Sequence, residues 1–183
     1  PLPDLPPPDS APPDAPTPDL PPPDLSPPDL LPPDLPPPAN DTCAKAKVLT
    51  LTGGKISEQG DTSSATNEFG AGVTCGGFSA YDGPQRYYRL KLTAGKLYSV
   101  KVTPGPTFDP ALYALPASSG CTSTGVNAGC LGQVTDVIGK GSSGVETLTL
   151  KPSASEDWLL VVDAYTATEK GPFTLEVSEA QPA

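Results

Sequence analysis

The sequence contains no histidine and no methionine, and it has a single tryptophan among its 183 residues. Without histidine, the commonest general base and the nitrogen ligand typical of zinc sites are both missing. Adjacent acids such as Glu156 and Asp157 remain, but nothing in the sequence selects two carboxylates for glycoside hydrolysis. We therefore expect a protein that is not an enzyme.

Residues 1–38 lack Lys and Arg altogether, although they hold seven of the 21 acidic residues and 19 of the 27 prolines. Most of the formal net charge of −10 therefore belongs to this segment. No basic patch is available to attract nucleic acid, and no apolar run is long enough to cross a bilayer. We expect neither a nucleic-acid partner nor a transmembrane segment. Because the sequence begins inside a repeat and without Met, we also expect that a signal or lipid anchor once preceded it.

Cysteine is scarce but even in number, with Cys43, Cys75, Cys121 and Cys130. An even set in a turn-rich chain without histidine favours disulfides over a metal cluster, and indicates an oxidising compartment outside the cytoplasm. Four cysteines allow three pairings. We expect Cys43–Cys75 and Cys121–Cys130, because each bridge would close a segment rich in Gly, Ser and Thr that has few apolar residues to hold it.

Aspartate recurs at every fifth position from 4 to 34, in the pattern x-Pro-Pro-Asp-Leu. Such a sequence cannot form a packed core, but it favours a polyproline II rod with a rise of ~3.1 Å per residue. We predict a stalk over residues 1–39, which acts either as a solvated spacer or as a ligand that docks in a groove of a neighbouring subunit. Hydroxyls beside proline, at Ser10, Thr17 and Ser26, suit O-glycosylation of such a stalk.

Short alternating runs separated by Gly, Ser, Asp and Pro begin at residue 40, and no convincing amphipathic helix is present. They predict an all-β fold, an antiparallel jelly-roll-like β-sandwich over residues 40–178 with a tail at 179–183. Residues 93–96 should form a hairpin turn, and the apolar run 158–162 a central strand covered on both faces. The expected strands are 46–51, 86–92, 97–103, 111–115, 133–138, 145–150, 158–164 and 173–178, with a weaker one at 62–67.

Five pieces of the sequence resemble the pre-peptidase C-terminal domain: residues 40–46 (NDTCAKA), 88–95 (YRLKLTAG), 108–113 (FDPALY), 160–163 (LVVD) and 171–177 (GPFTLEV). The resemblance implies a jelly-roll-like sandwich appended to secreted bacterial proteins, and in bacterial collagenases a related domain binds collagen with calcium. The proline-aspartate repeat is similar to those of bacterial surface lipoproteins. Together these resemblances imply an extracellular or cell-surface protein of bacterial origin.

The resemblance also implies a calcium site where the linker enters the sandwich, at Asn40 and Asp41. Calcium takes six to eight oxygen ligands, so further acids such as Asp61 and Asp82 would be needed. Two features depart from the calcium-binding relatives, namely residues 36–39 (PPPA) and Gln85, where acidic residues are common. The alternative for Asn40 and Asp41 is a turn-and-cap role.

The glycine-rich stretch 75–83 carries two aromatic residues, Phe78 and Tyr81. On a disulfide-anchored loop they could stack on sugars or seat a proline rod, or they could fold back over the edge of the sandwich.

These observations predict a non-enzymatic structural or adhesive protein, with a sandwich head on a proline-rich arm. Laying each arm along the next head would give a head-to-tail filament that does not close. The alternative is an accessory domain that uses calcium to target a secreted protein to collagen, peptide or polysaccharide. A third reading is a spacer and head without any ligand.

Overall fold

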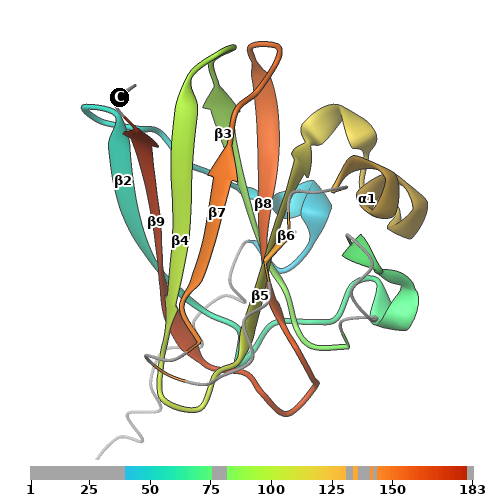
Figure 1. Ribbon diagram of the computed structural model, residues 1–183. Coiled ribbons are helices and arrows are strands. Elements are labelled where there is room, and N and C mark those ends of the chain that lie inside the picture. Colours follow the sequence, from blue (N-terminus) through green and yellow to red (C-terminus); the bar gives the residue numbers. More distant parts are fainter. Residues whose placement is uncertain (1–39, 76–81, 131–133, 136–140, 142–143, 181–183) are drawn as a thin grey trace, which may run out of the picture. The chain divides into compact units, whose positions relative to one another are not determined.

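The computed structural model describes residues 40–75, 82–130, 134–135, 141 and 144–180, and its strands form two sheets (Figure 1). One sheet has the order β1 (Lys47–Val48), β3 (Arg86–Leu92), β8 (Glu156–Ala164), β5 (Pro110–Pro116) and β6 (Val134–Thr135). The other has the order β2 (Lys55–Asp61), β9 (Pro172–Ala180), β4 (Leu97–Pro104) and β7 (Glu146–Leu150). Every pair is antiparallel except β1 with β3, which is parallel. The predicted all-β sandwich is confirmed.

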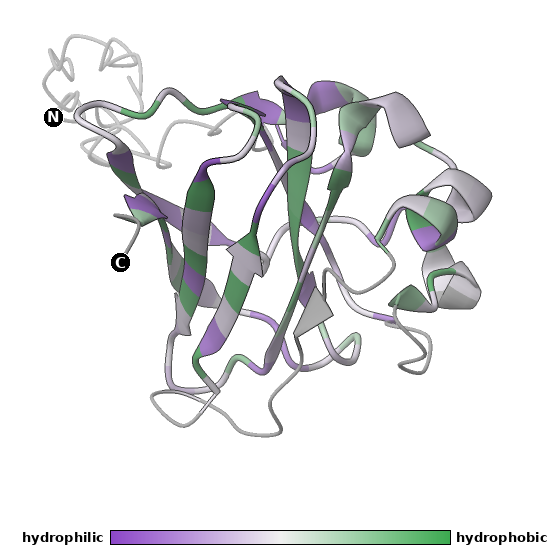
Figure 2. Ribbon diagram, turned by 45° about the horizontal axis from the view of Figure 1, so that its top comes forward, coloured by the Kyte–Doolittle hydropathy of each residue, from purple (hydrophilic) through white to green (hydrophobic). Residues whose placement is uncertain are grey.

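The main core lies between the two sheets and follows from period-two alternation in the strands, visible as alternating colours along them in Figure 2. In β3, Tyr88, Leu90 and Leu92 are buried in this core, while Lys91 is exposed. The strands β4 and β9 contribute their apolar positions in the same way. The outward positions of the four-stranded sheet carry exposed charges such as Lys55, Lys101 and Glu176.

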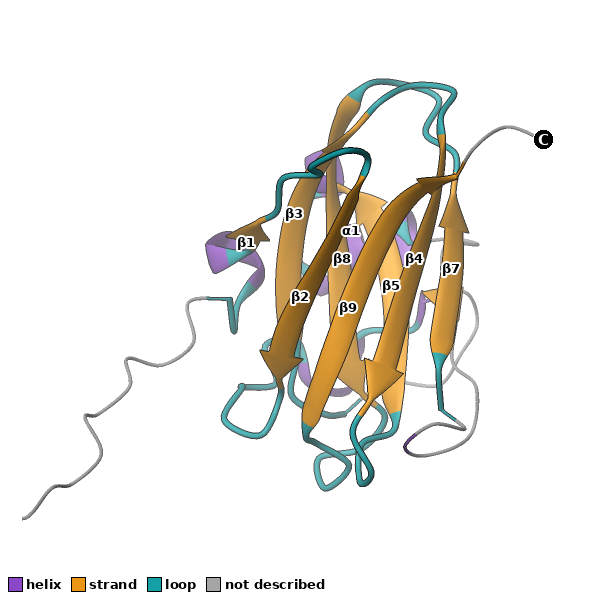
Figure 3. Cartoon of the chain, turned by 90° about the vertical axis from the view of Figure 1, so that its left-hand side faces the viewer, coloured by secondary structure: helices purple, strands orange, loops and turns teal. Residues whose placement is uncertain are grey.

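The strand β8 is buried on both faces, as its continuous apolar run predicted. Leu160 and Val162 point into the main core, whereas Leu159 and Val161 belong to a second apolar cluster. That second cluster contains buried cysteines and Val126 of the helix α1 (Ser123–Gly129). Figure 3 shows the four-stranded sheet in front of the five-stranded one, with α1 behind both. The five-stranded sheet is therefore the central layer.

The helix α1 corrects the expectation that the globular part has no helix. Short 3-10 turns also occur among the described residues, at η1 (Cys43–Lys45), η2 (Gly70–Gly72) and η4 (Ala117–Ser119). Thr122 caps α1, with its Oγ1 accepting the Gly125 N–H at 3.1 Å. Only Val126 of its seven residues is buried, so the sequence has no apolar stripe by which such a helix could be recognised.

The expected disulfide pairing is wrong. The bridges are Cys43–Cys121 and Cys75–Cys130, which span 78 and 55 residues of sequence. The helix explains the error, because Cys121 and Cys130 lie beyond its opposite ends. Seven residues of helix rise about 10 Å, more than a disulfide can span between Cα atoms. Each cysteine beside α1 therefore pairs with a partner far away in the sequence.

The expected hairpin at residues 93–96 is also wrong. The strand before it, β3, pairs with β1 and β8, whereas the strand after it, β4, pairs with β7 and β9. The turn therefore carries the chain from one sheet to the other. Gly95 adopts φ 76° there and donates its N–H to the carbonyl of Pro152 at 2.8 Å. A glycine between two alternating strands predicts that the chain turns there. It does not predict which sheet the second strand joins.

Three other boundaries differ from expectation. The weak strand expected at 62–67 is not a strand; β2 lies just before it, at Lys55–Asp61. The strand expected at 46–51 is reduced to β1, while β9 continues to Ala180, two residues into the predicted tail. Of the strand expected at 133–138, only β6 falls within the described residues. None of the helices in the described ranges is long and apolar enough to span a membrane.

Replacing Gly60 of β2 with alanine should destabilise the sandwich. A Cβ there would lie 2.3 Å from Cζ of Phe173 and 2.5 Å from the hydroxyl of Tyr88, and both rings are buried. We expect Gly60→Ala to lower the free energy of unfolding by roughly 1–3 kcal/mol through overpacking. Urea denaturation followed by tryptophan fluorescence measures it. Gly53→Ala serves as a comparison, because a Cβ at Gly53 would have no atom within 4 Å. Its φ of 60° adds some backbone strain.

Candidate functional site

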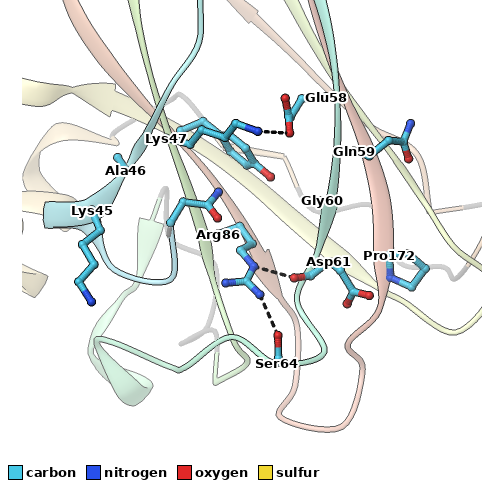
Figure 4. Close-up of a pocket in the computed structure, with 12 residues that line it drawn as sticks. Lys45, Ala46, Lys47, Glu58, Gln59, Gly60, Asp61, Ser64, Arg86 and Pro172 are labelled. Atoms are coloured by element: carbon cyan, nitrogen blue, oxygen red, sulfur yellow. Dashed lines mark hydrogen bonds and ion pairs between the residues drawn. The ribbon is translucent and has the colours of Figure 1, made fainter. Parts of the chain in front are cut away.

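A cavity of about 800 Å³ lies between the edge strands of the two sheets, and we call it the edge pocket. One side is formed by Lys45 of η1 and Lys47 of β1, and the other by Glu58 and Asp61 of β2. Arg86 and Tyr88 contribute from β3 (Figure 4). The strand β1 pairs with only two residues of β3. An edge of each sheet therefore borders the pocket.

Arg86 is the buried cation of the edge pocket, with 1% of its surface exposed. Its Nε donates to the carbonyl oxygen of Asp61 at 2.6 Å, and its Nη2 donates to Oγ of Ser64 at 3.3 Å. Burial lowers the pKa of Arg86 from its ordinary value, and the nearby Asp41 and Asp61 oppose that shift. Its Nη1 is buried and has no hydrogen-bond partner within the described part of the chain. In Figure 4, the other two nitrogens of the Arg86 guanidinium point toward Asp61 and Ser64.

Asn40 and Tyr88 complete the pocket. Asn40 is buried and its backbone carbonyl accepts the N–H of Tyr87 at 2.9 Å, which fixes the start of the sandwich against β3. Burial raises the pKa of Tyr88 to about 12, and a hydrogen bond with Asn40 opposes that shift. The Tyr88 hydroxyl is therefore a neutral hydrogen-bonding group at physiological pH.

The residues predicted to bind calcium are held in other contacts. Oδ1 of Asp61 accepts the N–H of Ser63 at 2.6 Å, and Oδ1 of Asp82 accepts from Nδ2 of Asn67 at 3.1 Å. The backbone oxygen of Asp41 accepts from Thr66 at 3.4 Å. Among the described residues, no three His, Cys, Asp or Glu side chains lie close enough together to hold a metal ion. Asp41 and Asp61 are instead near the positive charge of Arg86.

The other predicted site residues lie outside the described residues. These are the aromatic pair Phe78 and Tyr81 and the candidate glycosylation sites Ser10, Thr17 and Ser26.

A buried polar network lies on the other face of β3, and the sequence analysis missed it. Gln85, noted there only as a departure from an acidic residue, donates from Nε2 to Oδ2 of Asp163 at 3.1 Å. Tyr113 donates its hydroxyl to the same oxygen at 3.1 Å, and Tyr87 donates to Oε1 of Gln85 at 2.9 Å. The N–H of Glu68 also donates to Oε1 of Gln85, at 2.9 Å. The signal available in the sequence was an acidic residue, Asp163, directly after the apolar run 158–162.

Asp163 is fully buried, and its Oδ1 has no hydrogen-bond partner in the described residues. Burial raises the pKa of Asp163 well above its ordinary value, and the negative charge of Asp82 acts in the same direction. The hydrogen bonds from Gln85, Tyr113 and the Ala164 backbone partly offset that increase. The network is enclosed by the second apolar cluster, so we assign it a structural role.

No protein-family model matches the sequence, and no curated protein sequence matches it either. Several solved structures are similar in fold, and three of them are the following. One is PliG of Aeromonas hydrophila, a periplasmic inhibitor of g-type lysozyme, with TM-score 0.39, 18% identity, and 74% of this chain and 96% of that chain covered. A second is the pre-peptidase C-terminal domain of a Bacillus anthracis collagenase, with TM-score 0.42, 14% identity, and coverage of 73% and 94%.

The third is CorA of Methylomicrobium album BG8, a surface-associated copper-binding protein, with TM-score 0.44, 11% identity, and coverage of 74% and 98%. TM-scores below 0.5 are too low for the function of any of these proteins to be assigned to this chain. The class that the fold itself defines is a two-layer β-sandwich stabilised by two disulfides. Those disulfides indicate an extracytoplasmic protein, either periplasmic or extracellular.

Proposed function

We propose that the chain is a non-enzymatic binding domain of a bacterial cell surface, structural or adhesive in role, and that the edge pocket is its binding surface. The observation that carries this proposal is the pocket itself, because about 800 Å³ of space between two sheet edges is enough to hold part of a peptide. Some of its charged residues are engaged in structural contacts, such as the Lys47–Glu58 ion pair and the two hydrogen bonds donated by Arg86. That arrangement suits recognition better than proton transfer.

The finer proposal is head-to-tail assembly, in which the proline-rich arm of one copy occupies the edge pocket of the next. Charge supports it, since residues 1–38 are acidic without any Lys or Arg, and all 11 basic residues lie in the rest of the chain. A contact between two different surfaces of identical subunits propagates without closing and gives a filament.

Sedimentation velocity over a hundredfold concentration range tests the assembly. We expect the average sedimentation coefficient to rise with concentration, and negative-stain images to show filaments one subunit wide. A single monomeric species at every concentration would remove the head-to-tail proposal.

Retention on insoluble collagen and polysaccharides, with and without a chelator, tests the alternative role. We expect retention no greater than that of an inert protein of similar charge, whether or not chelator is present. Retention that is lost with chelator would instead favour calcium-assisted targeting.

A further inference from the structure

The unpartnered nitrogen of Arg86 identifies the kind of ligand that the edge pocket takes. We propose that the pocket is a carboxylate-binding site, and that its occupant is an aspartate of the Pro-Pro-Asp-Leu repeat from a second copy of this chain. This inference rests on the proposed head-to-tail assembly and gives it a recognition residue. The sequence analysis did not consider Arg86 for this role.

The first step concerns hydrogen bonds. Arg86 donates to two uncharged oxygens, the carbonyl of Asp61 and the hydroxyl of Ser64, while its Nη1 has no acceptor among the described residues. The carboxylate of Asp61 could have been the acceptor for Nη1, but it is exposed and accepts the Ser63 N–H instead. The negative charges of Asp41 and Asp61 lie near this guanidinium, but Nη1 still lacks an acceptor. A ligand carboxylate would supply one, in the charge-assisted geometry that arginine favours.

The second step concerns the charge around the pocket. Its lining contains three cationic residues, Lys45, Lys47 and Arg86, and two anionic ones, Glu58 and Asp61. Lys47 is paired with Glu58, whereas Lys45 is exposed beside the pocket. The lining is positive by one charge, which Asp41, near Arg86 but outside the lining, offsets. The exposed Lys45 and the unpartnered nitrogen of Arg86 therefore favour an acidic ligand over a basic one.

The third step concerns the shape of the ligand. Five residues of polyproline II advance about 15 Å, so neighbouring repeat aspartates are too far apart to enter one pocket together. One carboxylate would reach Arg86, and the flanking proline and leucine would contact the apolar walls at Ala46 and Pro172. A proline-rich ligand has few backbone donors, so it can lie between two sheet edges without leaving many N–H groups unpaired.

The fourth step concerns which copy supplies the ligand. Asn40, which lines the pocket, directly follows residues 36–39, a run of three prolines and an alanine. Consecutive prolines favour an extended chain, and an arm that left its own pocket in this way would have to reverse sharply to re-enter it. The same stiffness lets the arm reach a pocket on another molecule. A second copy is therefore the favoured donor.

A complementation experiment on the full chain tests the proposal. The donor-defective variant changes the repeat aspartates to asparagine, at Asp4, Asp9, Asp14, Asp19, Asp24, Asp29 and Asp34. The acceptor-defective variant is Arg86→Gln. Because Arg86 is buried, a second acceptor variant, Lys45→Ala with Lys47→Ala, changes only exposed residues. Lys170→Ala, an exposed lysine that does not line the edge pocket, is the matched control.

In sedimentation velocity we expect the wild type and Lys170→Ala to assemble, and each defective variant alone to stay monomeric. A mixture of donor-defective and acceptor-defective chains should form mixed complexes of limited size, because the intact arms meet the intact pockets but growth cannot continue. Donor-defective or acceptor-defective chains that still assemble like the wild type would overturn the carboxylate site while leaving the assembly intact. A mixture that stays monomeric would also overturn it.

Peptide binding separates the site from the assembly. A fluorescein-labelled peptide of residues 21–35 (PPPDLSPPDLLPPDL) is titrated with donor-defective protein, whose own arm carries no competing carboxylate. We expect the peptide with Asn in place of Asp to bind about tenfold to hundredfold more weakly, as loss of a charge-assisted hydrogen bond implies. Binding by the Asp peptide when the wild type never assembles would keep the carboxylate site and reject the filament. Equal binding of the two peptides would reject the site.

Discussion

Removal of the Cys43–Cys121 bridge, by changing both cysteines to serine, is expected to lower the free energy of unfolding by about 4 kcal/mol. The bridge closes a long loop, with a sequence separation of 78 residues, so its loss frees many conformations of the unfolded chain. Urea denaturation of the double variant and the wild type measures the difference. A loss of this size is comparable to the whole stability of a small domain.

The second bridge should behave similarly. Changing Cys75 and Cys130 to serine removes a separation of 55 residues, and the same loop argument again predicts about 4 kcal/mol. The two losses should not add fully, because the two loops overlap in the sequence. Both bridges also hold the segment around α1, one to η1 and the other to the residues after η2.

Thiol titration checks which cysteines are paired in the disulfides. Each of these double variants should contain no free thiol, whereas Cys43→Ser with Cys75→Ser should leave Cys121 and Cys130 unpaired across α1. A disulfide-linked peptide containing Cys43 and Cys75 in digests of the native protein would contradict the pairing.

Strong alternation allowed much of the fold to be predicted. The limits of β3 agree with the expectation at both ends, and β4 and β9 agree within two residues, because each strand has one apolar and one polar face. The edge strand β2 was missed because its inward positions hold Ile56, Glu58 and Gly60, of which only one is apolar. Edge strands face solvent along one side, so packing imposes a weaker pattern on them.

Features set by distant parts of the chain could not be predicted in the same way. The disulfide pairing depended on α1, which shows no apolar stripe, and the sheet joined by β4 depended on partners more than 40 residues away. The resemblance to the pre-peptidase C-terminal domain predicted an all-β sandwich, in agreement with the structure. The calcium site that it implied stays a prediction, and two of its residues, Asp41 and Asp61, lie near the Arg86 guanidinium.

Arg86 itself was within reach of sequence reasoning. It shares the strand face of Tyr88, Leu90 and Leu92, the residues predicted to point inward. A charged residue in phase with an inward apolar set indicates a buried charge that needs a partner. The expected calcium ligands drew attention to the acidic residues around it instead.

Changing Asp163 to asparagine is expected to make the stability of the protein less dependent on pH. The pKa of Asp163 is raised in the folded protein above its ordinary value of 3.8, chiefly by burial. As the pH rises above about 4, Asp163 loses its proton in the unfolded chain but keeps it in the folded protein. This difference favours unfolding until the pH exceeds the pKa of Asp163 in the folded protein. One proton corresponds to a slope of up to about 1.4 kcal/mol per pH unit. Asparagine cannot titrate, so the variant should gain stability relative to the wild type as the pH rises.

Urea denaturation between pH 3.5 and 8 measures this difference. Asparagine keeps an oxygen that can accept from Gln85 and Tyr113, so the two proteins should have similar stability at the acidic end. Asp157→Asn, an exposed carboxylate on the same strand β8, is the matched control and should not reproduce the effect. A stability difference that is constant across the pH range would mean that the pKa of Asp163 is not raised in the folded protein.

The adjacent edge pocket gives the same variant a second use. Gln85 binds Asp163 on one face of β3, and the next residue, Arg86, points into the pocket on the other. Both proteins are measured at neutral pH in the donor-defective background, with and without Asp163→Asn. If the network only stabilises the sandwich, the two should bind the repeat peptide equally tightly. Weaker binding with unchanged stability would instead mean that the network sets the position of Arg86, since backbone shifts at Gln85 pass directly to its neighbour.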